Sequence, residues 1–388
     1  MRRGLTIIEM LVAMAVTLIL LFAVVRVFEI LGNGIHQSRA SIEMSSQLRA
    51  VIHRLEQDFE MLTVPTLPWL KSGTGYLEVI EGPLYDQYSH GGDDADGNFA
   101  DASTKYVESW ISGGRYAASD NDDMLAFTIA SKGDPYVANV NGTLVESHVA
   151  EVVWWVGSND MNGDGEIGVN EYTLNRRVIP VRKDMGRMLS LEDVSDRRNR
   201  YAHGSSAPFD LDRTVLMTPL TGDSQGEDVA LANLLSFDVQ VFDPESPISN
   251  HAEFGWVAGG DSVFGEATPF NPTRYGGYID LGRYGADPSV TQTHLTSTKP
   301  AGWAYTTWDT WPHLYEIDGQ DTDGDGTIDQ GADGLDNDGA NGVDDAEEAE
   351  TQPPYPFPLR GIQVRIRVLE SSTKQVRQAT VPISFVPE

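Results

Sequence analysis

The sequence predicts an α+β fold, in which a long N-terminal helix is followed by an antiparallel, β-rich domain with long loop insertions. Three observations support this prediction: an apolar N-terminal stretch, helical spacing of apolar residues after it, and apolar–polar alternation near the C-terminus. The chain has 388 residues, of which 40% are hydrophobic, so it can bury a sizeable core. It has no cysteine, which excludes disulfides and thiolate metal sites.

The charge of the chain bears on its partners. The formal net charge is −31, and the sequence has no basic stripe that could displace phosphate counterions, so nucleic acid is not an expected partner. The charge is also uneven, because residues 316–350 contain fourteen Asp and Glu but no Lys or Arg. Such a density is typical of a solvated run or of a cation site.

Residues 5–25 form the first predicted element, a transmembrane helix segment. Glu9 is their only charged residue, and the stretch is long enough to cross a hydrocarbon core of about 30 Å. Arg2 and Arg3 precede it, so the positive-inside tendency keeps the start of the chain in the cytoplasm. A cleaved secretory signal needs a shorter apolar core and a small-residue site, whereas Arg26 follows here; a plain signal anchor stays open as an alternative.

Glu9 is the unusual residue of this stretch. A charged side chain at the middle of a membrane costs about 2.5–3.5 kcal/mol on insertion scales, so it needs a partner or a shallow position. If the chain is cut between Gly4 and Leu5, the new N-terminus carries a positive amine and Glu9 becomes the fifth residue of the mature chain. The carboxylate can then neutralise an N-terminal amine, its own or that of a neighbouring subunit.

The run GLTIIE at residues 4–9 resembles the cleavage and methylation signal of type IV pilins and type II secretion pseudopilins. That family has a short basic leader, a glycine before the cut, an apolar first mature residue (more often Phe than the Leu5 found here) and a glutamate at the fifth. The resemblance implies a pilin-like fold, and a prepilin peptidase that removes the leader, residues 1–4, and methylates Leu5. It also implies that Glu9 guides docking against a neighbouring subunit in a helical filament.

The helix is expected to continue as an amphipathic segment through residues 26–64 and to end before Pro65. The glycines at 32 and 34 each cost about 1 kcal/mol relative to Ala, so a kink, an unwound turn or a break between two helices is expected there. The apolar face of the segment is expected to be core rather than a coiled-coil partner face; it consists of Leu48, Val51, Ile52, Leu55, Phe59 and Leu62.

The remaining chain, residues 65–388, is expected to form the β-rich domain. The clearest alternation, at 361–368, is followed by a turn at 371–374 and a partner strand at 380–385, which together predict a C-terminal hairpin. Further strands are predicted at 125–129, 152–156, 174–181 and 236–242.

The end of the helix resembles the J-type minor pseudopilins of type II secretion, through Arg49, Arg54, Leu55, Asp58 and Phe59. The length of the chain agrees, because major pseudopilins are much shorter. The resemblance implies a single-pass inner-membrane protein with its C-terminal domain in the periplasm, assembling with other pseudopilins to support export of folded proteins. The alternatives are a minor pilin of a type IV pilus or DNA-uptake machine, and a membrane-anchored calcium-binding surface protein or enzyme.

The acidic loop at 158–171 matches a twelve-residue calcium loop resembling that of an EF-hand. Oxygen donors occupy positions 1, 3 and 5, a glycine takes the turn at position 6, and a glutamate closes the loop at position 12. Because the flanks are predicted strands, a loop at a hairpin tip is expected rather than helix–loop–helix. The candidate calcium ligands are Asp160, Asn162, Asp164, Glu166 (through its carbonyl) and Glu171.

The acidic loop at 316–350 carries an Asp-x-Asp-x-Asp-Gly core that recurs in part at 336–339 and resembles thrombospondin type 3 or dockerin repeats. Position 12 of the first copy is Ala332, so a ligand would come from the next copy, which suggests a shared loop for one or two ions. A flexible acidic turn is the alternative at both loops. The candidate ligands here are Asp321, Asp323, Asp325, Thr327, Asp329, Asp333, Asp336 and Asp338.

The sequence does not predict an enzyme. It has no phosphate-binding Gly-Lys-Ser loop, no His-Glu-x-x-His and no Gly-x-Ser-x-Gly. His90, His203 and His313 are expected in loops, without the partner spacing of a catalytic or metal site. The aromatic cluster of Trp303, Tyr305, Trp308 and Trp311 is expected to pack in the core, with an exposed partner patch as the alternative.

Overall fold

The structure is a computed structural model, and every structural statement below concerns the residues that it describes. These are residues 7–67, 74–80, 123–140, 143–158, 172–181, 190–204, 207–211, 227–251, 255–258, 274–279, 281, 307–310, 313–321, 325–345, 348–350, 358–370 and 375–385.

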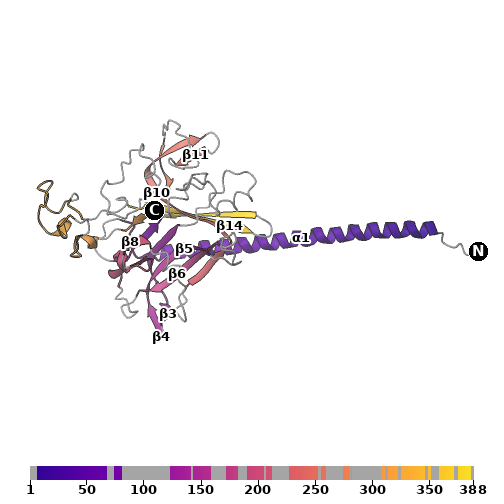
Figure 1. Ribbon diagram of the computed structural model, residues 1–388, viewed down its shortest axis with the longest axis horizontal. Coiled ribbons are helices and arrows are strands. Elements are labelled where there is room, and N and C mark those ends of the chain that lie inside the picture. The colour runs from indigo at the N-terminus through magenta and orange to yellow at the C-terminus, as the bar shows by residue number, and fades with distance from the viewer. Residues whose placement is uncertain are drawn as a thin grey trace, which may run out of the picture.

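Helix α1 (Ile7–Glu60) is one uninterrupted helix that extends far out of the body towards the N-terminus (Figure 1). It runs through Gly32 and Gly34, so the predicted unwound turn or break is wrong. Glycine lowers helix propensity without excluding helical geometry, and extending an existing helix is far easier than starting one, so the turns on either side carry the helix through. The hydroxyl of Ser38 donates to the Gly34 carbonyl (2.9 Å) inside this stretch.

The chain leaves α1 at Glu60, a few residues earlier than predicted, because the next residues pair with a strand. The Thr63 amide donates to the Thr128 carbonyl (3.0 Å), and the Ala130 amide donates to the Met61 carbonyl (2.8 Å). These bonds replace further helical turns and attach the end of the helix to the domain.

The first of two main sheets, here called sheet 1, is antiparallel throughout and has the strand order β13-β1-β2-β5-β6-β9. The predicted strands at 125–129, 152–156 and 174–181 lie in it. Its strands are β1 (Leu77–Ile80), β2 (Met124–Ala130), β5 (Val149–Ser158), β6 (Tyr172–Pro180), β9 (Glu227–Ala232) and β13 (Thr307–Asp309).

Sheet 2 has the order β11-β10-β14-β15, and β12 also pairs with β10. The C-terminal hairpin is confirmed, with β14 and β15 paired from Gly361 with Ser384 to Glu370 with Gln375. Asn233, with φ of 55°, joins β9 to β10, and asparagine tolerates this left-handed region. The strands are β10 (Leu234–His251), β11 (Gly255–Ala258), β12 (Arg274–Ile279), β14 (Gly361–Glu370) and β15 (Gln375–Ser384).

Two small hairpins and four short 3-10 helices complete the described elements. The hairpins are β3 (Tyr136–Val140) with β4 (Thr143–Ser147), and β7 (His203–Gly204) with β8 (Ala207–Leu211). The 3-10 helices are η3 (Asp193–Ser195), η4 (Arg197–Asn199), η8 (His313–Glu316) and η9 (Gln330–Ala332).

The second half of α1 forms one core with both sheets, as the apolar spacing predicts. Among the helix residues whose burial the structure describes, Met44 is the first that is buried, and the predicted Leu48, Val51, Leu55 and Phe59 are buried after it. Ile52 and Leu62 are partly buried against the same core. The ring of Phe59 stacks on Phe127 of β2, with centroids 4.7 Å apart. The domain is therefore built around the helix and is not merely attached to it.

Sheet 1 is buried on both faces, because successive side chains of a strand point in opposite directions. Trp154 of β5 and Arg176 of β6 face the helix, where both bond to Asp58. Their neighbours Trp155 and Arg177 lie on the outer face, where the guanidinium sits 5.0 Å from the indole. Residues 193–203, here called the arginine segment, cover this outer face.

Candidate functional site

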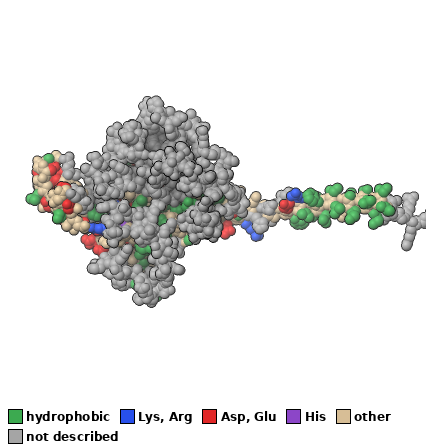
Figure 2. Space-filling model, in the orientation of Figure 1, with side chains coloured by type: hydrophobic (Ala, Val, Ile, Leu, Met, Phe, Trp, Pro, Cys, Tyr) green, Lys and Arg blue, Asp and Glu red, His purple; other side chains and the backbone are tan. Residues whose placement is uncertain are grey.

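The exposed part of α1 is the first functional feature. Residues Met10–Glu29 are long and apolar enough to cross a membrane, with a mean hydropathy of 2.7, and none of this stretch is buried. Figure 2 shows apolar side chains gathered along the helix where it protrudes from the body. Exposed apolar surface on this scale marks contact with a membrane or a partner.

Of the residues predicted for processing and assembly, Glu9 alone is among the described residues. Gly4 and Leu5 are outside the described residues, and Glu9 lies in the first turn of α1. The predicted mature chain would therefore enter the helix almost at once.

The first acidic loop joins two paired strands, since β5 and β6 are antiparallel and Ser158 pairs with Tyr172 at their ends. The predicted strands on either side of the loop are therefore antiparallel partners, as a hairpin requires. Its five predicted ligands are themselves outside the described residues: Asp160, Asn162, Asp164, Glu166 and Glu171.

The second acidic loop, here called the acidic repeat (residues 316–350), lies at the end of the molecule opposite the N-terminus (Figure 1). Its sequence repeats after fifteen residues, so that Asp318, Gly319, Asp321 and Asp329 recur as Asp333, Gly334, Asp336 and Asp344. Asp323 is outside the described residues, but its counterpart Asp338 is described.

The backbone follows the same repeat. The Gly319 amide donates to Asp329 (3.0 Å), and the Gly334 amide donates in the same way to Asp344 (2.9 Å). Both of these aspartates have a φ of 53°. The two copies thus share this hydrogen bond and this backbone conformation as well as their sequence pattern.

The second copy brings together three carboxylates in a manner suited to a cation. One oxygen each of Asp336, Asp338 and Glu348 lies within 4.8 Å of the others. Calcium prefers such hard oxygen ligands, so the donor set fits this ion chemically. Asp336 and Asp338 were predicted as ligands; Glu348 was not, although it lies fifteen residues after the predicted Asp333 and so takes the equivalent place in the second copy.

Backbone hydrogen bonds favour the ionised form of Glu348. Its side chain is only 2% exposed and accepts hydrogen bonds from the amides of Asp338 (3.1 Å), Asp345 (3.2 Å) and Asn337. Burial alone would raise the pKa of Glu348, but these backbone donors hold it below its ordinary value.

In the first copy, the predicted ligands bond to their own loop. Asp321 accepts from the Gly326 amide (3.0 Å) and Asp325 accepts from the Thr327 amide (2.7 Å). Asp329, as noted, accepts from the Gly319 amide. Within the described residues, which lack Asp323, the first copy does not bring three acidic oxygens together.

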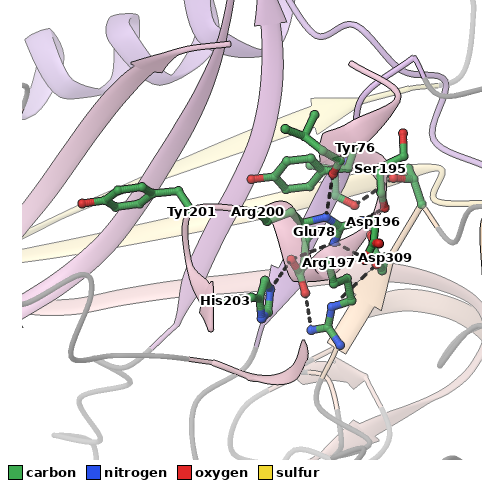
Figure 3. Close-up of polar contacts among 12 residues, drawn as sticks. Tyr76, Glu78, Ser195, Asp196, Arg197, Arg200, Tyr201, His203 and Asp309 are labelled. Atoms are coloured by element: carbon green, nitrogen blue, oxygen red, sulfur yellow. Dashed lines mark hydrogen bonds and ion pairs between the residues drawn. The ribbon is translucent and has the colours of Figure 1, made fainter. Parts of the chain in front are cut away.

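A buried ion-pair cluster lies on the outer face of sheet 1, where the arginine segment covers it (Figure 3). Glu78 of β1 is its centre: the carboxylate bonds to Arg200 (2.9 Å), to His203 (2.9 Å) and to Arg197. Asp309 of β13 accepts from the same Arg200 (2.9 Å). All five side chains are at most 2% exposed, so the cluster is part of the fold and not an accessible reaction centre.

The charges of this cluster control the ionisation of Glu78. Burial alone would raise the pKa of Glu78, but Arg197, His203 and Arg200 together hold it well below its ordinary value. Burial raises the pKa of Asp309 above its ordinary value, although Arg200 opposes the rise. The guanidinium of Arg200 also stacks on the ring of Tyr76, 4.1 Å from its centroid.

A third buried carboxylate extends the cluster along the sheet. Glu151 of β5 accepts from the Tyr76 hydroxyl (2.9 Å) and from the Tyr201 amide (3.1 Å). Burial, together with Glu151, raises the pKa of Tyr76 well above its ordinary value. The sheet and the arginine segment are therefore joined by hydrogen bonds as well as by ion pairs.

The sequence does not predict this cluster, and for His203 the expectation of a loop position is wrong. His203 lies in β7 and is 2% exposed, because the arginine segment folds inward onto Glu78. The sequence does contain one indication of the cluster: Arg197, Arg198 and Arg200 lie close together in a strongly acidic chain. Trp308, from the predicted aromatic core group, is buried in the core; the other members are outside the described residues.

Asp58, one of the residues that resemble the J-type minor pseudopilins, links α1 to sheet 1 through hydrogen bonds. It is fully buried. Its carboxylate accepts hydrogen bonds from Nε and Nη2 of Arg176 (2.7 Å each) and from the Trp154 indole N–H (3.0 Å). Such two-point pairing fixes direction as well as distance. It sets the register of the helix against the sheet.

Comparison of the chain with protein-family models, with curated proteins and with solved structures gave no match. The conclusions about fold and site therefore rest on the chain itself.

Proposed function

We propose that this chain is a J-type minor pseudopilin of a type II secretion system, which assembles at the tip of a periplasmic pseudopilus and supports export of folded proteins. The observation that carries the proposal is the continuity of α1. Its exposed apolar half passes without interruption into a half that forms the core of the domain. A simple anchor needs no such shared helix, whereas a filament subunit needs its membrane segment and its body held in one fixed relation.

The proposed mechanism is assembly rather than bond chemistry. Prepilin peptidase cuts between Gly4 and Leu5 and methylates the new amine. Glu9 then pairs with the N-terminal amine of a neighbouring subunit, which removes the cost of an isolated charge in the inner membrane. The exposed apolar side chains of α1 exchange lipid for the helices of other pseudopilins as the filament forms.

Mass spectrometry of the protein purified from its own host tests the processing. The expected mature chain begins with a methylated Leu5, whereas an intact Met1 would support the membrane-anchored alternative. Glu9→Gln is expected to be processed but not incorporated into the filament, and Glu29→Gln, a change of the same kind at an exposed pair with Arg26, is the matched control. Normal incorporation of Glu9→Gln would contradict the proposal.

Deletion of the gene separates the two filament functions. Folded proteins are expected to accumulate in the periplasm instead of reaching the medium. Loss of surface pili or of DNA uptake, with secretion intact, would instead support the minor pilin.

We also propose that calcium occupies the acidic repeat. The support is the convergence of Asp336, Asp338 and Glu348 together with the recurrence of the loop. A bound cation would also relieve the mutual repulsion of these carboxylates. With calcium at a hundredfold its dissociation constant, each site would add about 2.7 kcal/mol to the free energy of unfolding.

A melting experiment on the full chain in detergent tests calcium binding. The melting temperature is expected to rise with calcium chloride and to fall with chelator. The double variant Asp336→Asn, Asp338→Asn is expected to lose most of this response, and the exposed Asp134→Asn to keep it. A wild-type curve that does not respond to calcium or chelator would show that the loops bind no structural ion.

A further inference from the structure

A short bridge, residues 313–318, connects the acidic repeat to the body. It follows β13, whose Asp309 belongs to the buried ion-pair cluster. Tyr315 and Glu316 in the bridge are 2% and 1% exposed, although the next residue, Ile317, is 59% exposed. The bridge is therefore packed into the body, and the chain becomes exposed directly after Glu316.

The arginine segment holds this bridge from the body side. The Arg197 amide donates to the Tyr315 hydroxyl (3.0 Å). The Arg198 guanidinium forms ion pairs with Asp318 (2.8 Å) and with Asp196 (2.7 Å), and the side chain of Asp318 is only 6% exposed. Asp318 is also the first residue of the first copy of the repeat, so its side chain links the acidic repeat directly to the arginine segment.

The bridge also holds the repeat from within. The Glu350 amide donates to Glu316 (2.9 Å), and the Gln330 amide donates to the carboxylate of Glu350 (3.3 Å). Gly331 packs so closely there that a Cβ atom would come within 2.3 Å of Glu316. The beginning, the middle and the end of the repeat thus meet on Glu316.

The other side of the arginine segment lies on sheet 1. Arg197 and Arg200 are buried against Glu78 and Asp309, and Tyr201 bonds through its amide to Glu151. A continuous set of contacts therefore runs from the acidic repeat, through the bridge, to the outer face of the sheet. Its members are buried or partly buried, so water does not replace them readily.

We propose that cation binding in the acidic repeat is coupled to the packing of the arginine segment on sheet 1. This inference rests on the calcium binding proposed above. An ion that orders the repeat holds Glu316 and Asp318 in place, and these residues and Tyr315 then restrain residues 193–203 against local opening. Cation binding in the acidic repeat thereby stabilises the packing on sheet 1, the sheet that contacts α1.

Amide hydrogen exchange of the full chain in detergent tests the coupling, with calcium chloride or chelator as the only difference. Calcium is expected to slow exchange at 325–345 and also, about fivefold or more, at 193–203, which corresponds to the lower range of measured couplings between sites. In Tyr315→Phe, which removes the acceptor for Arg197 without a change of charge, protection of the repeat should persist while that of 193–203 falls. Tyr278→Phe, in β12 of the other sheet, is the matched control.

The outcomes separate the two proposals. Protection of the repeat without protection of 193–203 in the wild-type chain would overturn the coupling and leave calcium binding intact. Equal calcium protection of 193–203 in wild type and in the double variant Tyr315→Phe, Asp318→Asn, which removes both contacts of the bridge with the arginine segment, would also overturn the proposed route. Protection of neither region would overturn calcium binding and the coupling together.

Discussion

Glu78 lies in a strand whose other residues are apolar, with Arg197, Arg200 and His203 around its carboxylate. Glu78→Gln keeps the shape but leaves two buried guanidinium groups with one carboxylate, that of Asp309, between them. Breaking a buried charge pair costs about 3–5 kcal/mol, and a loss of that order in the free energy of unfolding is expected. Denaturant titration followed by tryptophan fluorescence measures it. Glu192→Gln, an exposed residue at the edge of the same segment, should change stability little.

The acid side of the stability profile tests the same residue. The pKa of Glu78 in the folded chain lies well below its ordinary value of 4.5. Its contribution to stability is therefore fully present above about pH 4.5 and is lost as the pH falls through the lower pKa of the folded state. The difference in melting temperature between wild type and Glu78→Gln should be largest at neutral pH and should shrink below about pH 4. Asp309, with a raised pKa, acts in the opposite sense. A difference that grows on acidification would contradict the assignment of Glu78.

Single residues also show where sequence reasoning stops. The apolar positions of α1 were predicted because their spacing is local and repeats every helical turn. Glu78 and Arg200 are brought together by folding across more than a hundred residues, and no local pattern encodes such a pairing. Asp58 belongs to a predicted run, but its partners Arg176 and Trp154 come from two distant strands.

At the scale of elements, the acidic repeat is held closed by the tight packing of Gly331 against Glu316 and Ala349 at its base. Gly331→Ala would bring a methyl group within 2.3 Å of Glu316 and 3.0 Å of the Ala349 Cα atom. The base of the repeat should open, and limited proteolysis within 325–345 should become faster. Gly133→Ala, which meets nothing within 4 Å, should leave the proteolysis pattern unchanged. An unchanged pattern in Gly331→Ala would mean that the repeat is not held closed by this contact.

The elements themselves were predictable to different degrees. The C-terminal hairpin and three strands of sheet 1 follow from alternation, which is a property of each strand alone. The edge strand β13 was not predicted, because three residues carry too little pattern. The break expected at Gly32 and Gly34 failed for another reason: propensity is a weak term beside the cooperative extension of a long helix.

At the scale of the whole molecule, the exposed apolar stretch and the domain core occupy separate halves of one helix. The apolar stretch ends at Glu29, and burial in the domain, where the structure describes it, begins at Met44. A chain that begins at residue 36 should therefore dissolve without detergent and keep nearly the melting temperature of the full chain. Analytical ultracentrifugation and circular dichroism check this expectation. Aggregation of the shortened chain, or loss of its cooperative melting, would show that the exposed half also supports the fold.

The position of β13 has a consequence for the order in which the molecule forms. The Leu77 amide donates to the hydroxyl of Thr310, 233 residues later in the chain (2.9 Å), and β13 seals the edge of sheet 1 next to β1. Contacts so distant form slowly, because a long loop must close before they contribute any stabilisation. Until that late strand has emerged from the ribosome, Glu78 lacks the neighbouring Asp309 and β1 lacks its partner strand on that side, so an interrupted chain would expose a strand edge that favours aggregation.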